Sequence, residues 1–164
     1  MDEGCCRPLG EAESAFFNKE AVLKKYVPFR DLLEKERSLG KPRYLDGFLR
    51  EASISAGQRV LEIGINPGYL AIYLAEVVGA NGKVVLAELD EIIVPDAEKN
   101  IRSYGVSDLV EIAKARVEKL PFRTNYFDIV LSDRTTSLIK DKSKLIQEMT
   151  RVLKSKGRLV LADM

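Results

Sequence analysis

Short apolar runs alternate with longer amphipathic segments over most of the chain. The short runs are rich in Val, Ile and Leu, which is typical of strands that are covered on both faces. They span residues 59–63, 83–88, 110–113, 127–131 and 158–162. The amphipathic segments repeat apolar residues at helical spacing and predict helices over residues 68–78, 91–104 and 141–154. This alternation predicts an α/β fold in which right-handed crossovers build a parallel sheet.

A further helical pattern occupies residues 11–38, before the first predicted strand. Its apolar residues fall near one face, and they are Val22, Tyr26, Phe29, Leu32 and Leu33. Pro28 is predicted to break this helix or to restart it, because proline donates no backbone hydrogen bond. A second short helix is predicted from about residue 42, with the apolar residues Tyr44, Leu45, Phe48 and Leu49. We therefore expect a helical cap segment over residues 1–56 and a core domain over residues 57–164.

The sequence V-L-E-I-G-I-N-P-G at residues 60–68 joins the first predicted strand to the following helix. A glycine loop in this position lets a ligand approach the backbone amides at a helix N-terminus, which favour anionic groups. The second strand ends in Glu88, whose carboxylate can accept hydrogen bonds from a ribose diol. These features predict a nucleotide-type ligand at the carboxyl ends of the strands. Glu62, two residues before Gly64, is foreign to the dinucleotide pattern G-x-G-x-x-G.

Several further blocks follow in order: G-K-V-V-L-A-E, K-L-P-F-R-T-N-Y-F-D-I-V-L-S-D and E-M-T-R-V-L-K-S-K-G-R-L-V-L-A-D. With these blocks, residues 57–163 resemble the class I S-adenosylmethionine-dependent methyltransferases of the quinone-biosynthesis, small-molecule type. The resemblance implies a three-layer αβα, Rossmann-like parallel sheet with the strand order 3-2-1-4-5. It also implies S-adenosyl-L-methionine as cofactor and a small molecule as the methyl acceptor.

The resemblance assigns cofactor-binding roles to residues at the first two strand ends. Glu62 is expected to orient the glycine loop and to reach the methionine amino group. Gly64 and Gly68 are expected to keep the backbone close to the ligand, and Glu88 to hold the ribose. In the resembled family the N-terminal helices lie over the cofactor, so their aromatic residues either touch ligand or pack in the core; these are Tyr26, Tyr44 and Phe48.

Other roles fall to residues after the second, third and fourth strands. Leu89 and Val117 are expected to offer apolar contact to the adenine faces. Ser132 and Asp133 lie where the family places groups near the reacting methyl. Methyl transfer is an in-line displacement that needs a base only if the acceptor must lose a proton. Asp133 is the candidate for that base, and a solvated loop acid is the alternative.

Two positions depart from the resembled family. Asn66 stands where glycine is usual, and Pro67 biases it toward extended geometry, so Asn66 is predicted to be the N-cap of the following helix. Its side chain would then lie where the cofactor usually passes. Arg116 stands where an aspartate usually accepts a hydrogen bond from adenine. A guanidinium only donates, so Arg116 is expected to stack on the ring or to donate to a ring nitrogen.

Composition narrows the range of partners. The chain has 164 residues and 46% hydrophobic content, enough to bury a sizeable core in one globular unit. The net charge is +1 with no long Lys/Arg tract, so no nucleic-acid partner is predicted. No apolar run reaches the about 18 residues of a membrane span, and residues 1–10 lack an apolar signal core. We therefore predict a cytoplasmic protein without a membrane span.

These 164 residues contain no histidine and two adjacent cysteines, Cys5 and Cys6. The lack of imidazole excludes Ser-His-Asp and Cys-His nucleophile systems and His-ligated zinc, and no metal site is predicted. The cysteines are interpreted as part of an unconstrained tail, with a thiophilic metal or metalloid site as the alternative. Three functions stay open: a methyltransferase, a methyltransferase-like module that acts through a partner, and a nicotinamide oxidoreductase. The sequence lacks the pattern G-x-G-x-x-G that a nicotinamide oxidoreductase requires.

The resemblance also implies a helix and two strands beyond the fifth strand, whereas the sequence ends at Met164. We therefore expect strands 6 and 7 to be absent and the fifth strand to form an open edge. Its apolar residues are Leu159, Val160 and Leu161. Because an open apolar edge favours pairing with another chain, a homodimer or a partner chain along this strand is predicted.

Overall fold

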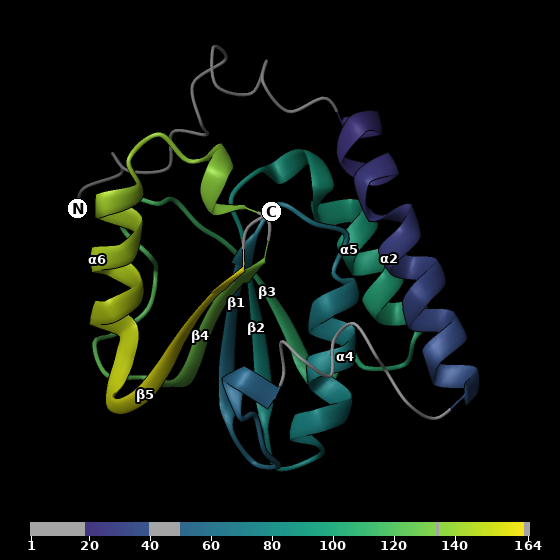
Figure 1. The fold of residues 1–164 in the computed structure, drawn as a ribbon, viewed down its shortest axis with the longest axis horizontal. Helices are drawn as coiled ribbons and strands as arrows, with labels where there is room; N and C mark the ends of the chain where they lie inside the picture. Colours follow the sequence, from purple (N-terminus) through teal and green to yellow (C-terminus); the bar gives the residue numbers. More distant parts are fainter. Residues whose placement is uncertain (1–18, 40–49, 134, 163–164) are drawn as a thin grey trace, which may run out of the picture.

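The sheet has five parallel strands in the order β3-β2-β1-β4-β5, as predicted (Figure 1). The structure is a computed structural model that describes residues 19–39, 50–133 and 135–162. The strands are β1 (Arg59–Gly64), β2 (Lys83–Glu88), β3 (Val110–Lys114), β4 (Phe127–Asp133) and β5 (Leu153–Ala162). The strand order reverses beside β1, which makes the carboxyl ends of β1 and β4 the switch point of the sheet.

The predicted crossover helices are present with small changes at their ends. They are α4 (Tyr69–Val78), α5 (Val94–Ser103) and α6 (Lys142–Val152), with short 3-10 turns η1 (Glu91–Ile93) and η2 (Thr136–Leu138). The helix predicted from residue 91 begins as η1, and α5 follows with proline in its first turn, where the missing N–H is not needed. Within the described ranges, no helix is long and apolar enough to cross a bilayer.

Helix α6 lies on one side of the sheet and α4 and α5 lie on the other, which makes the predicted three-layer αβα arrangement (Figure 1). An apolar cluster lies on each face of the sheet. Alternate residues of one strand enter different clusters, as the period of two along a strand requires. Val60 and Leu86 pack with Leu74 of α4 and Ile101 of α5. On the opposite face, strand residues pack against α6; this cluster includes Leu61, Val85, Val130, Leu145 and Met149. Both faces are thus closed by helices.

The predicted break at Pro28 is wrong, because α2 (Lys19–Leu39) runs without interruption through this position. A proline removes one helical hydrogen bond, and a helix tolerates that loss where neighbouring turns are held by packing. Tyr26 on α2 is 5% exposed and belongs to the cluster that α4 and α5 cover. Residues 50–52 are helical, whereas the rest of the predicted second helix lies outside the described residues. The division at residue 56 stays a prediction.

The fifth strand is longer than predicted, but its regular pairing covers the predicted residues. Phe127 of β4 lies opposite Leu153, whereas Ile129 lies opposite Arg158, so the ladder skips residues 154–157 of β5. Gly157 permits this irregularity, because a Cβ there would lie 2.7 Å from the backbone oxygen of Asp128. From Arg158 onward the pairing is continuous to Ala162. In the described part of the chain, β5 forms one edge of the sheet.

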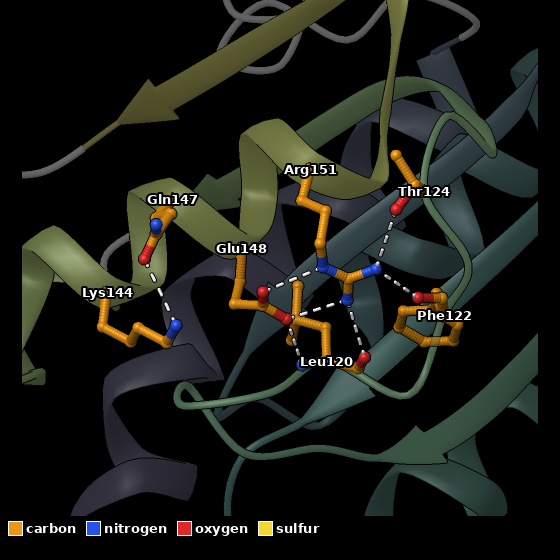
Figure 2. Close-up of polar contacts among 7 residues, drawn as sticks. All are labelled: Leu120, Phe122, Thr124, Lys144, Gln147, Glu148 and Arg151. Carbon is orange, nitrogen blue, oxygen red and sulfur yellow. Dashed lines mark hydrogen bonds and ion pairs between the residues drawn. The ribbon is translucent and has the colours of Figure 1, made fainter.

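An ion pair on α6 fixes the loop between β3 and β4 (Figure 2). The guanidinium of Arg151 donates to both carboxylate oxygens of Glu148 at 2.9 and 2.8 Å. It also donates to the backbone oxygens of Leu120 and Phe122 at 3.0 and 2.8 Å. Glu148 in turn accepts a hydrogen bond from the backbone amide of Leu120 at 2.8 Å. The loop after β3 is therefore held to α6 by backbone groups, whatever its side chains are.

Candidate functional site

Three strands end side by side at the switch point of the sheet. Gly64 at the end of β1 lies opposite Glu88 at the end of β2. On the other side of β1, Glu62 lies opposite Leu131 of β4, so Ser132 is the next residue toward the same edge. Ligands of open α/β sheets bind outside the carboxyl ends of the strands at this point. Residues from three separate segments of sequence therefore meet where a ligand is expected.

The polar side chains at these strand ends are buried and only partly hydrogen bonded. Glu62, Glu88 and Ser132 are 1%, 2% and 0% exposed. Within the described structure, Glu62 Oε2, Glu88 Oε2 and Ser132 Oγ have no hydrogen-bond partner. A buried polar atom without a partner costs about 1 to 3 kcal/mol, so such atoms are rare unless a ligand or water completes them. These three atoms lie at neighbouring strand ends, which makes this edge a candidate site for a polar ligand.

Asn66 links the two buried carboxylates to the start of α4. Its Nδ2 donates to Glu62 Oε1 at 2.8 Å, and its backbone amide donates to Glu88 Oε1 at 3.2 Å. Its Oδ1 accepts a hydrogen bond from the backbone amide of Gly68 at 2.8 Å. Asn66 is 3% exposed, so these bonds are shielded from solvent.

The predicted role of Asn66 as N-cap is wrong, because the N-cap of α4 is Gly68. Gly68 adopts φ 86° and ψ 7°, a left-handed conformation that turns the chain into the helix. Pro67 accordingly precedes the N-cap and lies outside the first turn of α4. Asn66 instead accepts from an amide two residues ahead, a common turn for asparagine. On the other side, Asn100 Nδ2 donates to the backbone oxygen of Pro67 at 3.0 Å.

The two glycines of the loop are required for different reasons. A Cβ on Gly64 would lie 2.7 Å from Asn66 Nδ2 and 3.2 Å from Thr135 Oγ1, so the side chain of Asn66 is packed directly against the end of β1. A Cβ on Gly68 would meet Ala97 and Ile101 at an ordinary 3.6 Å. Its positive φ, rather than lack of space, makes glycine favourable there.

Burial dominates the electrostatics of the two carboxyl groups. It raises the pKa of Glu62 from 4.5 to about 8, although the hydrogen bond from Asn66 acts in the opposite direction. The negative charge of Asp133 adds to the increase. Burial also raises the pKa of Glu88 well above its ordinary value, and the charge of Glu62 contributes in the same direction. A cationic group of a ligand would act in the opposite direction and would favour the ionised form of these carboxyl groups.

The end of β4 contributes Ser132, the half-buried Asp133 and a threonine that the sequence analysis did not single out. Thr135 is 0% exposed, and its Oγ1 donates to the backbone oxygen of Asp133 at 3.2 Å. Thr135 Oγ1 also lies close to the position that a Cβ on Gly64 would take. Nothing in the sequence marks Thr135 as a site residue, because only the pairing of β4 with β1 brings it beside the end of β1.

The residues predicted to contact adenine separate into a buried and an exposed group. Leu89 and Val117 are 5% and 9% exposed and belong to the same apolar cluster. Arg116 Nε lies 3.4 Å from Glu118 Oε2, and 40% of its side chain is exposed. The guanidinium of Arg116 is therefore engaged with a neighbouring acid at the surface. Its predicted stacking on the adenine ring stays a prediction.

Some predicted residues lie outside the described part of the chain, namely Tyr44, Phe48, Cys5 and Cys6. Tyr26, the remaining aromatic candidate of the N-terminal helices, is a core residue on α2.

Comparison with known proteins decides the family. A family model described as "Methyltransferase domain" matches residues 54–164. This chain belongs to the class I S-adenosylmethionine-dependent methyltransferases. The ubiquinone/menaquinone biosynthesis C-methyltransferase UbiE of Proteus mirabilis is 33% identical over 144 residues, which cover 87% of this chain and 56% of that protein. The methyltransferase chain thus spans little more than half the length of this curated relative.

Solved structures of methyltransferases share the fold. An S-adenosylmethionine-dependent methyltransferase from Aquifex aeolicus has a TM-score of 0.66 and 28% identity, covering 79% of this chain and 71% of its own. The [4+2]-cyclase SpnF has a TM-score of 0.65 at 23% identity, covering 71% of this chain and 42% of its own, and shows the fold alone. The family agrees with the predicted cofactor class and argues against a nicotinamide oxidoreductase.

Proposed function

We propose that this methyltransferase chain binds S-adenosyl-L-methionine at the carboxyl ends of β1, β2 and β4 and transfers its methyl group to a small-molecule acceptor. The observation that carries the proposal is the set of three buried polar atoms without a partner, Glu62 Oε2, Glu88 Oε2 and Ser132 Oγ. They come from three neighbouring strands, below the glycine loop at the start of α4. Hydroxyl and ammonium donors of such a cofactor would satisfy the two carboxylate atoms.

Glu88 and the apolar pair beside it would hold the nucleoside end. Glu88 Oε1 already accepts from the backbone amide of Asn66, which leaves Oε2 for a ribose hydroxyl. Leu89 follows directly in sequence, and Val117 shares its apolar cluster, so both would offer surface to the adenine ring. Arg116 would donate to a ring nitrogen or stack on the ring only after leaving Glu118.

Glu62 and the loop glycines would hold the amino-acid end. Glu62 Oε2 would accept from its ammonium group, and the lack of a side chain on Gly64 and Gly68 lets the ligand approach the backbone. When bound, the cofactor supplies an electrophilic methyl group on a sulfonium centre. Ser132 and Asp133 would then face the acceptor, and Asp133 would take the proton of an acceptor that carries one on its nucleophilic atom.

A second candidate function is a methyltransferase-like module that acts through a partner and has little or no activity of its own. The observation that favours it is the side chain of Asn66, which already uses Glu62 Oε1 and the amide of Gly68. The fold alone does not decide between the two functions, because one fold supports different chemistries.

The partner and location of the chain stay predictions. The predicted homodimer or partner chain would pair along β5, which forms an edge of the described sheet and carries Leu161 at 42% exposure. Of the three apolar residues predicted for this edge, Leu159 and Val160 are half-buried. The cytoplasmic location rests on the sequence analysis alone.

Calorimetric titration of the purified chain tests the cofactor. S-adenosylhomocysteine should bind and should raise the melting temperature, whereas NAD should do neither. Binding of NAD without binding of S-adenosylhomocysteine would contradict the proposal. A radiolabelled methyl donor with candidate quinol acceptors would then separate an active enzyme from a binding module.

The Glu88→Ala variant locates the ribose. It removes a buried carboxyl acceptor and should weaken binding of S-adenosylhomocysteine by about 1.5 to 3 kcal/mol. Glu98→Ala is the control, because Glu98 is an exposed acid on α5. Equal affinities of the two variants would mean that another residue holds the ribose.

A further inference from the structure

We propose that the side-chain amide of Asn66 occupies, in the ligand-free chain, the place of the zwitterionic amino-acid end of the cofactor. It must turn away before that end can bind. The inference rests on the proposed function and concerns how the same site discriminates between ligands. It assigns to Asn66 a specificity-determining role that reduces the preference of the site for complete cofactors over their nucleoside part.

The first support is chemical complementarity. The amide of Asn66 offers a donor, Nδ2, to the carboxylate of Glu62 and an acceptor, Oδ1, to the N–H of Gly68. Both bonds are 2.8 Å long. An amino acid carries an ammonium donor and a carboxylate acceptor on one carbon, so it presents the same pair of groups. A buried acid and a helix-start amide are the partners that such a zwitterion requires.

The second support is the lack of spare room. Asn66 is 3% exposed, and its Nδ2 lies 2.7 Å from the position of a Cβ on Gly64. The space above the end of β1 that the missing Cβ leaves open is therefore filled by the Asn66 amide. A ligand group cannot reach Glu62 Oε1 or the Gly68 amide while the Asn66 side chain stays there.

The third support comes from the buried atoms that Asn66 leaves without a partner. The second carboxylate oxygen of Glu62 has none among the described residues, although Glu62 is 1% exposed. One amide thus satisfies only part of a site that an ammonium group, with three donors, would satisfy more fully. Asn66 bonds to Glu88 only through its backbone amide, which donates to Oε1, so the side chain of Asn66 does not occupy Glu88 Oε2.

These contacts predict unequal effects on the two ends of a ligand. The nucleoside end would use Glu88 and the apolar residues beside it without displacing the Asn66 side chain. The amino-acid end gains contacts to Glu62 Oε1 and to the amide of Gly68 only after two hydrogen bonds of Asn66 are broken. Methylthioadenosine, which lacks the amino-acid end, should therefore bind nearly as tightly as S-adenosylhomocysteine.

The test is the ratio of the two affinities, measured by calorimetry for four forms of the full chain. Asn66→Ala removes the amide and keeps a Cβ, and Asn66→Gly serves as second variant should the first fail to fold. Asn100→Ala is the matched control: it removes the bond from Asn100 Nδ2 to Pro67 O, and so loosens the same loop while leaving the Asn66 amide in place.

In both Asn66 variants the preference for S-adenosylhomocysteine over methylthioadenosine should rise by about tenfold or more relative to the unmodified chain. The affinity for methylthioadenosine should change by less than about threefold, and Asn100→Ala should leave the ratio unchanged. An unchanged or reduced ratio in the Asn66 variants, with both ligands binding, would overturn this inference alone. Failure of both ligands to bind any of the four forms would instead overturn the proposed function, and this inference with it.

Discussion

Replacing Glu62 by glutamine should make the protein less sensitive to alkaline pH. Glu62 is 1% exposed, and burial raises its pKa from 4.5 to about 8. A group whose pKa is higher in the folded than in the unfolded chain stabilises the fold at low pH and loses that contribution as pH rises. The loss through Glu62 therefore begins near pH 4.5 and continues until the pH passes about 8.

The magnitude follows from the interval between the two pKa values. At about 1.36 kcal/mol per pKa unit, the full interval corresponds to about 5 kcal/mol. Between about pH 5 and about pH 8, ionisation of Glu62 should lower the free energy of unfolding by about 3 kcal/mol. Glutamine cannot ionise, and its side-chain oxygen can still accept the hydrogen bond from Asn66 Nδ2.

Urea unfolding followed by circular dichroism at several pH values between about 5 and 8 measures the effect. The advantage of Glu62→Gln over the unmodified chain should grow with pH by about 3 kcal/mol over this range. Glu98→Gln removes an exposed carboxylate from α5 and is the control. Should the difference between Glu62→Gln and the unmodified chain stay constant within about 0.5 kcal/mol, Glu62 ionises normally and the reasoning from burial is wrong.

Four further predictions concern neighbouring features of the fold. Ionisation of Glu148 should have the opposite effect on stability, because the hydrogen bond from Arg151 lowers the pKa of Glu148. The stabilising contribution of Glu148 should be lost in acid, so urea unfolding should show that the difference between Glu148→Gln and the unmodified chain shrinks as pH falls below the ordinary pKa of a glutamate. Arg151→Met should lower the free energy of unfolding by about 2 to 4 kcal/mol, because it frees the loop after β3 and leaves Glu148 without its ion-pair partner. The control Arg102→Met, at an exposed position of α5, should lower it by less than about 0.5 kcal/mol. Gly64→Ala should lower the free energy of unfolding by about 1 kcal/mol less in an Asn66→Ala background than in the unmodified chain, because the nearest atom to the new Cβ is Asn66 Nδ2. If the effects of the two substitutions simply add in a double-mutant cycle, the packing described for this loop is wrong. Leu161→Lys should reduce self-association in sedimentation experiments, whereas Leu138→Lys, which changes an equally exposed leucine on η2, should not; a chain that is monomeric without either change would refute pairing along β5.

The sequence by itself determined the architecture and the strand ends at which the predicted site residues lie. Apolar runs bounded by turn residues defined all five strands, and the alternation with helices left a parallel sheet as the expected result. The order of strand, glycine loop, helix, strand and acid located Glu62 and Glu88 at the strand ends where the structure has them. These features are local or periodic, so they are encoded in neighbouring residues.

Only the tertiary structure decided how the parts of the site meet. Thr135 comes close to Gly64 from a loop that lies far away in sequence, because β4 pairs with β1. The hydrogen bonds of Asn66 depend on the backbone turn at Gly68, which is the N-cap of α4, whereas the sequence predicted Asn66 for that position.

The same distinction explains the two other differences. Proline disfavours a helix interior locally, yet α2 continues through residue 28, and Tyr26 packs in the core two residues before it. The loop after β3 has no regular pattern that predicts its course, and the pair Glu148 and Arg151 fixes it from α6 through backbone groups. Propensity acts between neighbours in sequence, whereas these contacts join residues that become neighbours only once the sheet has formed.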